Sequence, residues 1–351
     1  MRYALLVVAG GILFGTTGTV SALAPDGATP TSIGAARLAF GGALLGLIGL
    51  LSHLRSRHSV RVRRARNAGT VPTFHNADAA TRSISASIRP TTRDDDTAAD
   101  SARARTAKPR GQVVREILVV LACSSAIMLY QPTFLEGTKS NGVMVGTMVA
   151  LGSAPVLAGL FEWIVLRRRP TLAWLVATVL AVGGVFALSH TPAVQAPVSP
   201  AGLGDSLIAG ACYAVLAVGS KWLLQHGWRP LGVAAATMAV GAAMAIVTLA
   251  RTDVSWLAQP RGLAVTVWLA LATIVVADLL NITGLTHTSA ASATTLNLAE
   301  PTTATLLSLI VLGERMTPLH GLGIAAIVAG VLLLGLTARA QSEGARAVGA
   351  G

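Results

Sequence analysis

The chain has 351 residues, of which 53% are hydrophobic and 12% are charged, and its formal net charge is +12. Apolar runs of about 20 residues, long enough to cross a bilayer, recur along the chain and indicate an all-α integral membrane protein. The sequence has no metal-ligand spacing, no phosphate-binding glycine loop and no nucleophile triad. We therefore expect no enzyme activity, no metal and no cofactor.

The apolar runs predict ten transmembrane helices. They cover 3–22, 32–52, 115–134, 143–166, 172–189, 205–224, 231–250, 263–285, 291–312 and 319–337. The first run also imitates a secretory signal, but Pro25 is unfavourable after a cleavage site and removal of this run would leave nine spans. We therefore interpret it as a helix. Its glycines at 11, 15 and 18 predict close packing against a neighbouring helix.

A segment at about 53–111 separates the second span from the third. It is rich in Arg, Ser, Thr, Ala and Asp and has scarcely an apolar run, which predicts a disordered basic insertion. Its first part, 55–66, is basic enough to lie on anionic lipid headgroups. A tolerated linker is the simpler interpretation of this segment, and a regulatory role is the alternative.

Positive charge is distributed unevenly between the two sides of the predicted topology. If the N-terminus is cytoplasmic, most of the 27 Lys and Arg residues lie on the cytoplasmic side, including Arg167, Arg168 and Arg169. The positive-inside rule thus predicts a multi-pass protein of the cell membrane with both termini cytoplasmic. The net charge is a topology signal and does not indicate a nucleic-acid partner. We expect Glu162 to reach this cytoplasmic interface and its basic residues.

An internal repeat divides the chain into two halves. Residues 147–188 match residues 293–334 without a gap, always 146 positions apart. The matched pairs include Pro155 with Pro301, Arg169 with Arg315, and Gly184 with Gly330. Each half holds five spans, an odd number, so the halves must have opposite orientations in the membrane. We predict two inverted five-helix repeats, 1–189 with the insertion and 203–337, followed by a cytoplasmic tail at 338–351.

Glu300 is the strongest candidate for a functional residue. It lies near the middle of the ninth span, with Asn297 one turn earlier on the same helix face. Pro301 lacks an N–H and should kink the helix and free the carbonyl of Asn297, and Pro155 should kink the fourth span in the same way. Two broken helices at symmetric positions are typical of a transporter's binding site. The alternative is a structural role for Glu300 at a kink.

Other polar residues within spans are further candidates, because charge in hydrocarbon needs a partner or a cavity. Asp278 and Asn281 lie three residues apart in the eighth span, and Arg37 lies in the second. Arg37 has the alternatives of a snorkelling side chain or a fixed internal ion pair. The aromatic and amide side chains that could line a solute path are those of Tyr130, Gln131, Trp174 and Tyr213.

Five motifs resemble the EamA family of the drug/metabolite transporter superfamily. They are GILFGTTG at 11–18, AARL at 35–38, THTSAA at 286–291, NLAEP at 297–301 and LGERMT at 312–317. The resemblance covers nearly the whole chain except the insertion, and it implies ten helices in two halves and solute export. The first half departs from the pattern, with Ala154 opposite Glu300 and Arg167-Arg168 opposite Gly313-Glu314.

These observations predict a secondary transporter that exports a small organic metabolite or drug by alternating access. No nucleotide-binding motif is present, so an ion gradient or the solute's own gradient must supply the energy. Protons are the simplest coupling ion, through Glu300 or Asp278, because a low-dielectric cavity favours the protonated carboxyl group. The alternatives are an intramembrane enzyme, a sensor or a flippase for lipid-linked solutes. The expected partners are a small-molecule solute and the lipid bilayer, and a homodimer stays open.

Overall fold

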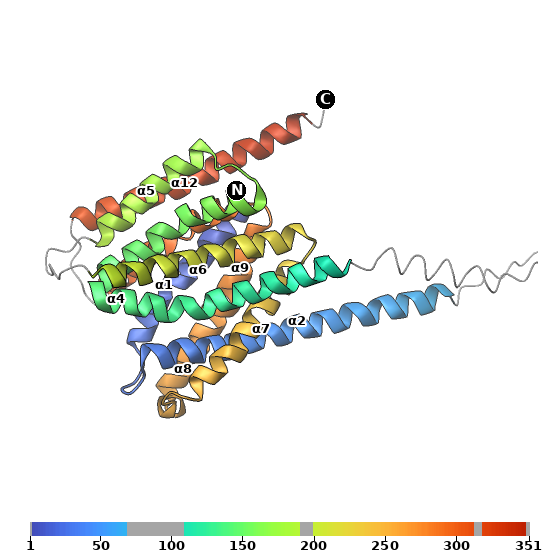
Figure 1. Cartoon of the computed structure of the whole chain (residues 1–351), viewed down its shortest axis with the longest axis horizontal. Helices are drawn as coiled ribbons and strands as arrows, with labels where there is room; N and C mark the ends of the chain where they lie inside the picture. Colours follow the sequence, from blue (N-terminus) through green and yellow to red (C-terminus); the bar gives the residue numbers. More distant parts are fainter. Residues whose placement is uncertain (1, 69–108, 190–198, 312–317, 349–351) are drawn as a thin grey trace, which may run out of the picture. The chain divides into compact units, whose positions relative to one another are not determined.

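The computed structural model describes residues 2–68, 109–189, 199–311 and 318–348, and every regular element in these ranges is helical. The elements are α1 (Arg2–Ala22), α2 (Pro30–Ala68), α4 (Arg110–Leu166), α5 (Leu172–Ser189), α6 (Pro200–Gln225), α7 (Pro230–Leu249), η2 (Ser255–Ala258), α8 (Pro260–Trp268), η3 (Leu269–Val276), α9 (Ala277–Leu285), α10 (Ala290–Leu296), α11 (Ala299–Val311) and α12 (Pro318–Val348). The predicted all-α class is confirmed. Figure 1 shows these helices in the colours of the sequence.

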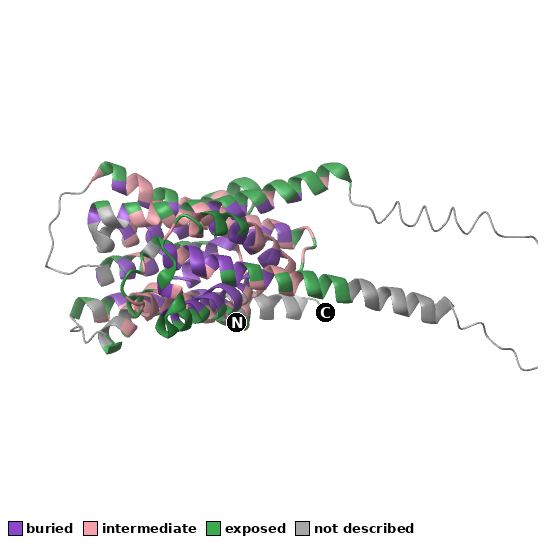
Figure 2. Ribbon diagram, turned by 90° about the horizontal axis from the view of Figure 1, so that it is seen from below, coloured by how far each residue is buried: buried purple, intermediate pink, exposed green. Residues whose placement is uncertain are grey.

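By length and composition, seven helical segments among the described residues can cross a membrane. The ranges Leu172–Ala187 and Gly321–Leu334 are shorter apolar helices, and the predicted ninth span is divided between α10 and α11. Large apolar side chains such as Ile164 (60% exposed) and Ile310 (78% exposed) face outward. Figure 2 shows exposed residues along the outer helices and buried residues between them. An outer surface of this kind is suited to contact with lipid tails.

The third and fourth predicted spans form one continuous element, α4, with Pro132 and Pro155 inside it. Its two halves nevertheless run in opposite directions along α6. The neighbouring pairs are Cys123 with Val215 and Gly137 with Ser206 in the first half, and Ser153 with Gly210 and Glu162 with Lys221 in the second half. As the chain runs through the first half of α4, the residue numbers of its partners on α6 decrease. Through the second half of α4 they increase. The element doubles back on itself and still contains two segments that can cross a membrane.

Helix α1 packs closely against the break and α11 through two of its predicted glycines. A Cβ built at Gly15 would lie 2.6 Å from the carbonyl oxygen of Glu300, and one built at Gly11 would lie 3.4 Å from Asn297. Gly10, one position before Gly11, similarly faces Ala277 of α9. The predicted close packing is therefore right for Gly11 and Gly15. It is wrong for Gly18, because no heavy atom of the described residues lies within 4 Å of a Cβ built there.

Helices α5 and α12 lie side by side and cross through small residues (Figure 1). A Cβ built at Gly184 would lie 2.6 Å from the carbonyl oxygen of Gly323. In turn, a Cβ built at Gly330 would lie 2.7 Å from the carbonyl oxygen of Ala177. Glycines at both crossing points let the two backbones approach closely.

The chain divides into two compact units, one made of Met1–Leu50 and Val119–Gly351 and the other of Leu51–Leu118. In the second unit α2 continues to Ala68, well beyond the predicted end of the span at residue 52. The first part of the predicted disordered insertion is therefore helical. Its arginines and alanines are good helix formers, and the next residue is Gly69. Residues 69–108 of the insertion lie outside the described part of the chain.

Candidate functional site

The ninth predicted span is interrupted between α10 and α11. Helix α10 ends at Leu296, and α11 begins at Ala299. Two hydrogen bonds between residues three positions apart span the interruption. They join the Leu298 N–H to the Thr295 carbonyl at 3.1 Å and the Glu300 N–H to the Asn297 carbonyl at 2.9 Å. The predicted kink is thus a break, and the Asn297 carbonyl that we expected to be free accepts a bond. Pro301 lies in the first turn of α11, where no intrahelical partner for an N–H is needed.

Asn297, at the break, is tied to α6. Its Nδ2 donates to the hydroxyl of Tyr213 at 2.8 Å, and Asn281 of α9 hydrogen bonds to the same tyrosine. The ring of Tyr130 lies 6.4 Å from that of Tyr213. Asn297 is 5% exposed, and its Oδ1 has no hydrogen-bond partner among the described residues. A buried acceptor without a partner is rare in proteins, so this one is available to a ligand or to water.

Arg37 approaches the same place from α2. Its Nη1 donates to Thr17 Oγ1 at 3.5 Å, and its charge interacts with Glu300 and Tyr130. Gln131 lies next to Gly34, one turn before Arg37, with 3.6 Å between Gln131 Oε1 and a Cβ built at Gly34. We define the polar cluster as Arg37, Tyr130, Tyr213, Asn281, Asn297 and Glu300. Seven of the eleven candidates predicted from sequence, the six of the cluster and Gln131 beside it, thus come together from α2, α4, α6, α9 and α11 with the break before it.

Asp278 is buried one turn before Asn281, and its Oδ2 has no hydrogen-bond partner among the described residues. It follows η3, a π-helical segment from Leu269 to Val276, in which the eighth span is locally widened. Such widening is frequent at functional sites. Arg37 acts electrostatically on Glu300, whereas no charged group in the described chain does so on Asp278. The two carboxyl groups therefore have different surroundings.

Pro155 does not break its helix, in contrast to the prediction of two broken helices. It is buried inside the continuous α4. Leu151, the counterpart of Asn297, has an aliphatic side chain that packs in an apolar cluster with Leu298. Asn297 is held by the hydroxyl of Tyr213, whereas the side chain of Leu151 has no polar group that could make such a bond. This difference accounts for a break beside Pro301 and none beside Pro155.

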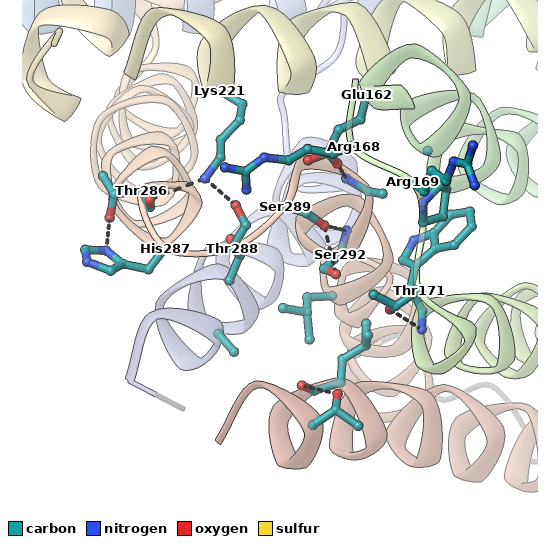
Figure 3. Close-up of a pocket in the computed structure, with 18 of the residues that line it drawn as sticks. Glu162, Arg168, Arg169, Thr171, Lys221, Thr286, His287, Thr288, Ser289 and Ser292 are labelled. Carbon is teal, nitrogen blue, oxygen red and sulfur yellow. Dashed lines mark hydrogen bonds between the residues drawn. The ribbon is translucent and has the colours of Figure 1, made fainter. Parts of the chain in front are cut away.

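A second polar region is a pocket of about 670 Å³ where α4, α6 and α9 end and α10 begins (Figure 3). Lys221 is 5% exposed and donates to the carbonyl oxygens of Leu285, Thr286 and Thr288, at 2.7, 3.3 and 2.6 Å. An ammonium group has three donors, and all three are used. Lys221 thus fixes the loop after α9. A cation is favourable at this position because the unpaired carbonyl groups at the C-terminal end of a helix carry partial negative charge.

Glu162 holds the other side of this loop. Its Oε2 accepts from the backbone N–H of Ala291 at 2.9 Å, at the beginning of α10. The residue is 3% exposed, so it lies deeper than we expected, but its charge does interact with Arg168 of the expected basic residues. The backbone partner explains the burial, because the first N–H groups of a helix have no intrahelical acceptor and attract a carboxylate. An acidic residue inside an apolar span was the only signal in the sequence that pointed to this role.

Known proteins resemble this chain in sequence and in fold. Residues 202–336 match the EamA-like transporter family. The uncharacterized transporter YwfM of Bacillus subtilis is 33% identical over 339 residues, which cover 97% of this chain and 95% of YwfM. The threonine/homoserine exporter RhtA of Escherichia coli K12 is 31% identical over 212 residues, 57% of this chain and 66% of RhtA. A solved crystal structure aligns with 97% of this chain and 98% of its own length, with a TM-score of 0.66 and 17% identity.

Proposed function

Because this chain belongs to the EamA-like transporter family, we propose that it exports a small organic solute by alternating access around the polar cluster. The observation that carries the proposal is the break between α10 and α11, which lies next to Glu300 and Arg37 among mainly apolar helices. Ionisable residues inside a membrane are expensive and usually serve a solute or ion path. Broken helices supply polar backbone and side-chain groups at such a path.

The ten-span inverted repeat is part of this proposal. Gly184 and Gly330 are counterparts in the internal repeat, and so are Ala177 and Gly323. If each residue is replaced by its counterpart in the other half of the chain, the contact of Gly184 with Gly323 therefore becomes the contact of Gly330 with Ala177. Such reciprocal contacts are typical of elements related by a two-fold axis. This supports a two-fold relation between α5 and α12.

The proposed orientation has both termini in the cytoplasm. The element ends that the positive-inside rule assigns to the cytoplasm gather at one pocket, to which Ala4, Arg168, Gln225 and Thr337 contribute. The ends assigned to the outside share an apolar cluster, which includes Val20, Ile33, Leu249, Trp256 and Val265. This grouping of the ends supports the predicted topology.

Amino acids are candidate solutes, because RhtA is named as an exporter of threonine and homoserine. Protons are the proposed coupling ion, with Glu300 as the carrier. Arg37 interacts with the charged form of Glu300 and not with its protonated form. Proton binding at Glu300 would therefore weaken its attraction to α2 and favour a different packing of the two halves.

The test is Glu300→Gln, which keeps the shape of the side chain and removes its charge. The variant should insert and fold normally, lose solute accumulation driven by a pH gradient, and retain exchange of solute across the membrane. Adding Ala154→Glu at the symmetric position should not restore accumulation, because Leu151 offers no counterpart to Asn297. Accumulation is measured with a labelled solute in liposomes.

The matched control is Asp253→Asn, which removes an exposed carboxylate in the loop before η2 and should leave accumulation unchanged. Full proton-driven accumulation by Glu300→Gln would refute its coupling role. Asp278→Asn would then show whether the second buried carboxyl group carries the proton.

A further inference from the structure

The pocket at the α9–α10 loop contains two buried polar atoms that the fold does not use. One is Glu162 Oε1, an acceptor, and the other is Trp174 Nε1, a donor. Both residues are more than nine-tenths buried, at 3% and 7% exposure, and neither atom has a partner among the described residues. Leaving such groups unpaired costs about 1–3 kcal/mol each. A ligand that supplies one donor and one acceptor would remove this penalty.

Helices α4 and α5 supply this pair of atoms, Glu162 from α4 and Trp174 from α5. Gly159 lies one turn before Glu162, and a Cβ built at Gly159 would lie 2.6 Å from the indole ring of Trp174. The missing side chain thus admits the indole next to the carboxylate. The repeat counterparts of Gly159, Glu162 and Trp174 are Thr305, Ser308 and His320, so the set occurs once in the chain. The arrangement therefore serves one end of the protein only.

The charges around the pocket are of both signs. Lys221 is saturated by three carbonyl groups, but Arg168 and Arg169 are exposed at the rim, and the charge of Arg168 interacts with Glu162. Figure 3 shows Glu162, Arg168 and Lys221 together on one side of the pocket. Arg167, the first residue after α4, adopts a φ of 56°, and its repeat counterpart is Gly313. This left-handed residue turns the chain directly before the two arginines.

We propose that this pocket is a separate solute subsite for a small zwitterion that carries one ammonium and one carboxylate group. The ammonium would donate to Glu162 Oε1, and the carboxylate would face Arg168, Arg169 and Trp174 Nε1. A plain carboxylate would leave the Glu162 Oε1 acceptor unpaired, and a plain amine would leave the Trp174 Nε1 donor unpaired and be repelled by the arginines. The inference rests on the proposed transport function and names the solute class. Leu296 lines the pocket and directly precedes Asn297, so the subsite adjoins the polar cluster.

The test measures binding of each of the twenty L-amino acids to the purified full chain by calorimetry. L-Threonine is compared with 3-hydroxybutyrate, which lacks the ammonium group, and with 1-amino-2-propanol, which lacks the carboxylate. At least one amino acid should bind, and the two threonine analogues should not. Glu162→Gln and Trp174→Phe should each raise Kd about tenfold or more, as expected for a lost charged or buried hydrogen bond. Trp163→Phe, at a half-exposed position on α4, is the matched control and should bind as wild type does.

Binding of no amino acid, binding of 3-hydroxybutyrate as tight as that of threonine, or wild-type affinity in both pocket variants would overturn the inference. The amide oxygen introduced by Glu162→Gln can still accept from the Ala291 N–H, but if this variant does not fold, Trp174→Phe decides the question alone. Transport separates the two proposals. A chain that binds amino acids in this pocket but moves none contradicts the transport function only. A chain that exports them with the same KM in wild type and both variants contradicts the subsite only.

Discussion

Tyr213 joins two helices at the polar cluster through a single hydroxyl. Asn297 donates to this hydroxyl from the break and Asn281 bonds to it from α9, so the tyrosine fixes both asparagines. Because Asn297 Oδ1 already has no partner in the described chain, the side chain depends on this one bond for its orientation.

Tyr213→Phe keeps the ring and removes that hydroxyl. The variant should insert normally, unfold with a free energy about 1–3 kcal/mol lower, and move solute more slowly, because the buried amide of Asn297 and the partly buried amide of Asn281 lose their partner. Chemical unfolding in detergent and flux in liposomes measure the two effects. Tyr3→Phe, which alters a ring stacked on His287 at 3.8 Å, is the control. Wild-type stability and flux of Tyr213→Phe would mean that the hydroxyl does not organise the cluster.

Individual residues show where sequence reasoning succeeds and where it ends. The approach of Arg37 to Glu300 could be predicted, because an ionised group inside an apolar run needs a partner. The contacts of Glu162 and Lys221 with the α9–α10 loop could not be predicted, because both residues bind backbone groups that are far away in sequence. Backbone N–H and carbonyl groups exist at every residue, so no side-chain pattern marks which of them will serve as partners.

At the scale of helices, α1 depends on glycine to reach the break. Its contact with α11 brings the backbone of Gly15 against Glu300 and Thr303, so α1 holds the residue on which the proposed mechanism depends. Proline chemistry predicted a kink near Pro301 but not the form of the break, because Pro155 stays inside a helix and the Asn297 carbonyl accepts a bond. The existence of apolar helical spans could be predicted from their length. The single continuous element of α4 and the π-helical η3 could not, because they arise from packing between segments.

Gly15→Ala should disturb this contact. The added methyl group would lie 2.6 Å from both the Glu300 carbonyl oxygen and the Thr303 Cβ, so α1 must move, at a cost of about 1–3 kcal/mol and with lower flux. Gly18→Ala on the same helix is the matched control, because open space surrounds it. The control should be neutral or stabilised by up to about 1 kcal/mol through helix propensity. Equal effects of the two substitutions on unfolding would show that α1 does not pack tightly at Gly15.

At the scale of the whole molecule, the insertion and the topology make separate predictions. Replacing residues 69–108 with a short Gly/Ser linker leaves α2 and α4 intact and should preserve expression and most of the flux, because the composition of this segment cannot bury a core. Quantitative expression and transport in vesicles measure the outcome. Loss of expression on this replacement would reveal an ordered domain or a required regulator.

The orientation is tested by reporter fusions. A reporter after Arg110 or Arg339 should be cytoplasmic, and one within 191–203, which has no Lys or Arg, should be external. Alkaline phosphatase and green fluorescent protein, each active on one side only, give the two signals. Reversed signals would invert the proposed orientation, and mixed signals would contradict the inverted repeat.

Solute flux is the most direct measurement of the proposed function. The purified protein is placed in liposomes and supplied with a panel of metabolites that includes the amino acids, with and without an imposed pH gradient. We predict that at least one small organic solute crosses faster than in protein-free vesicles and that the gradient drives its accumulation. If no solute in the panel moves faster than in protein-free vesicles, although the protein is folded and inserted, the polar cluster is not a transport site and the account is contradicted.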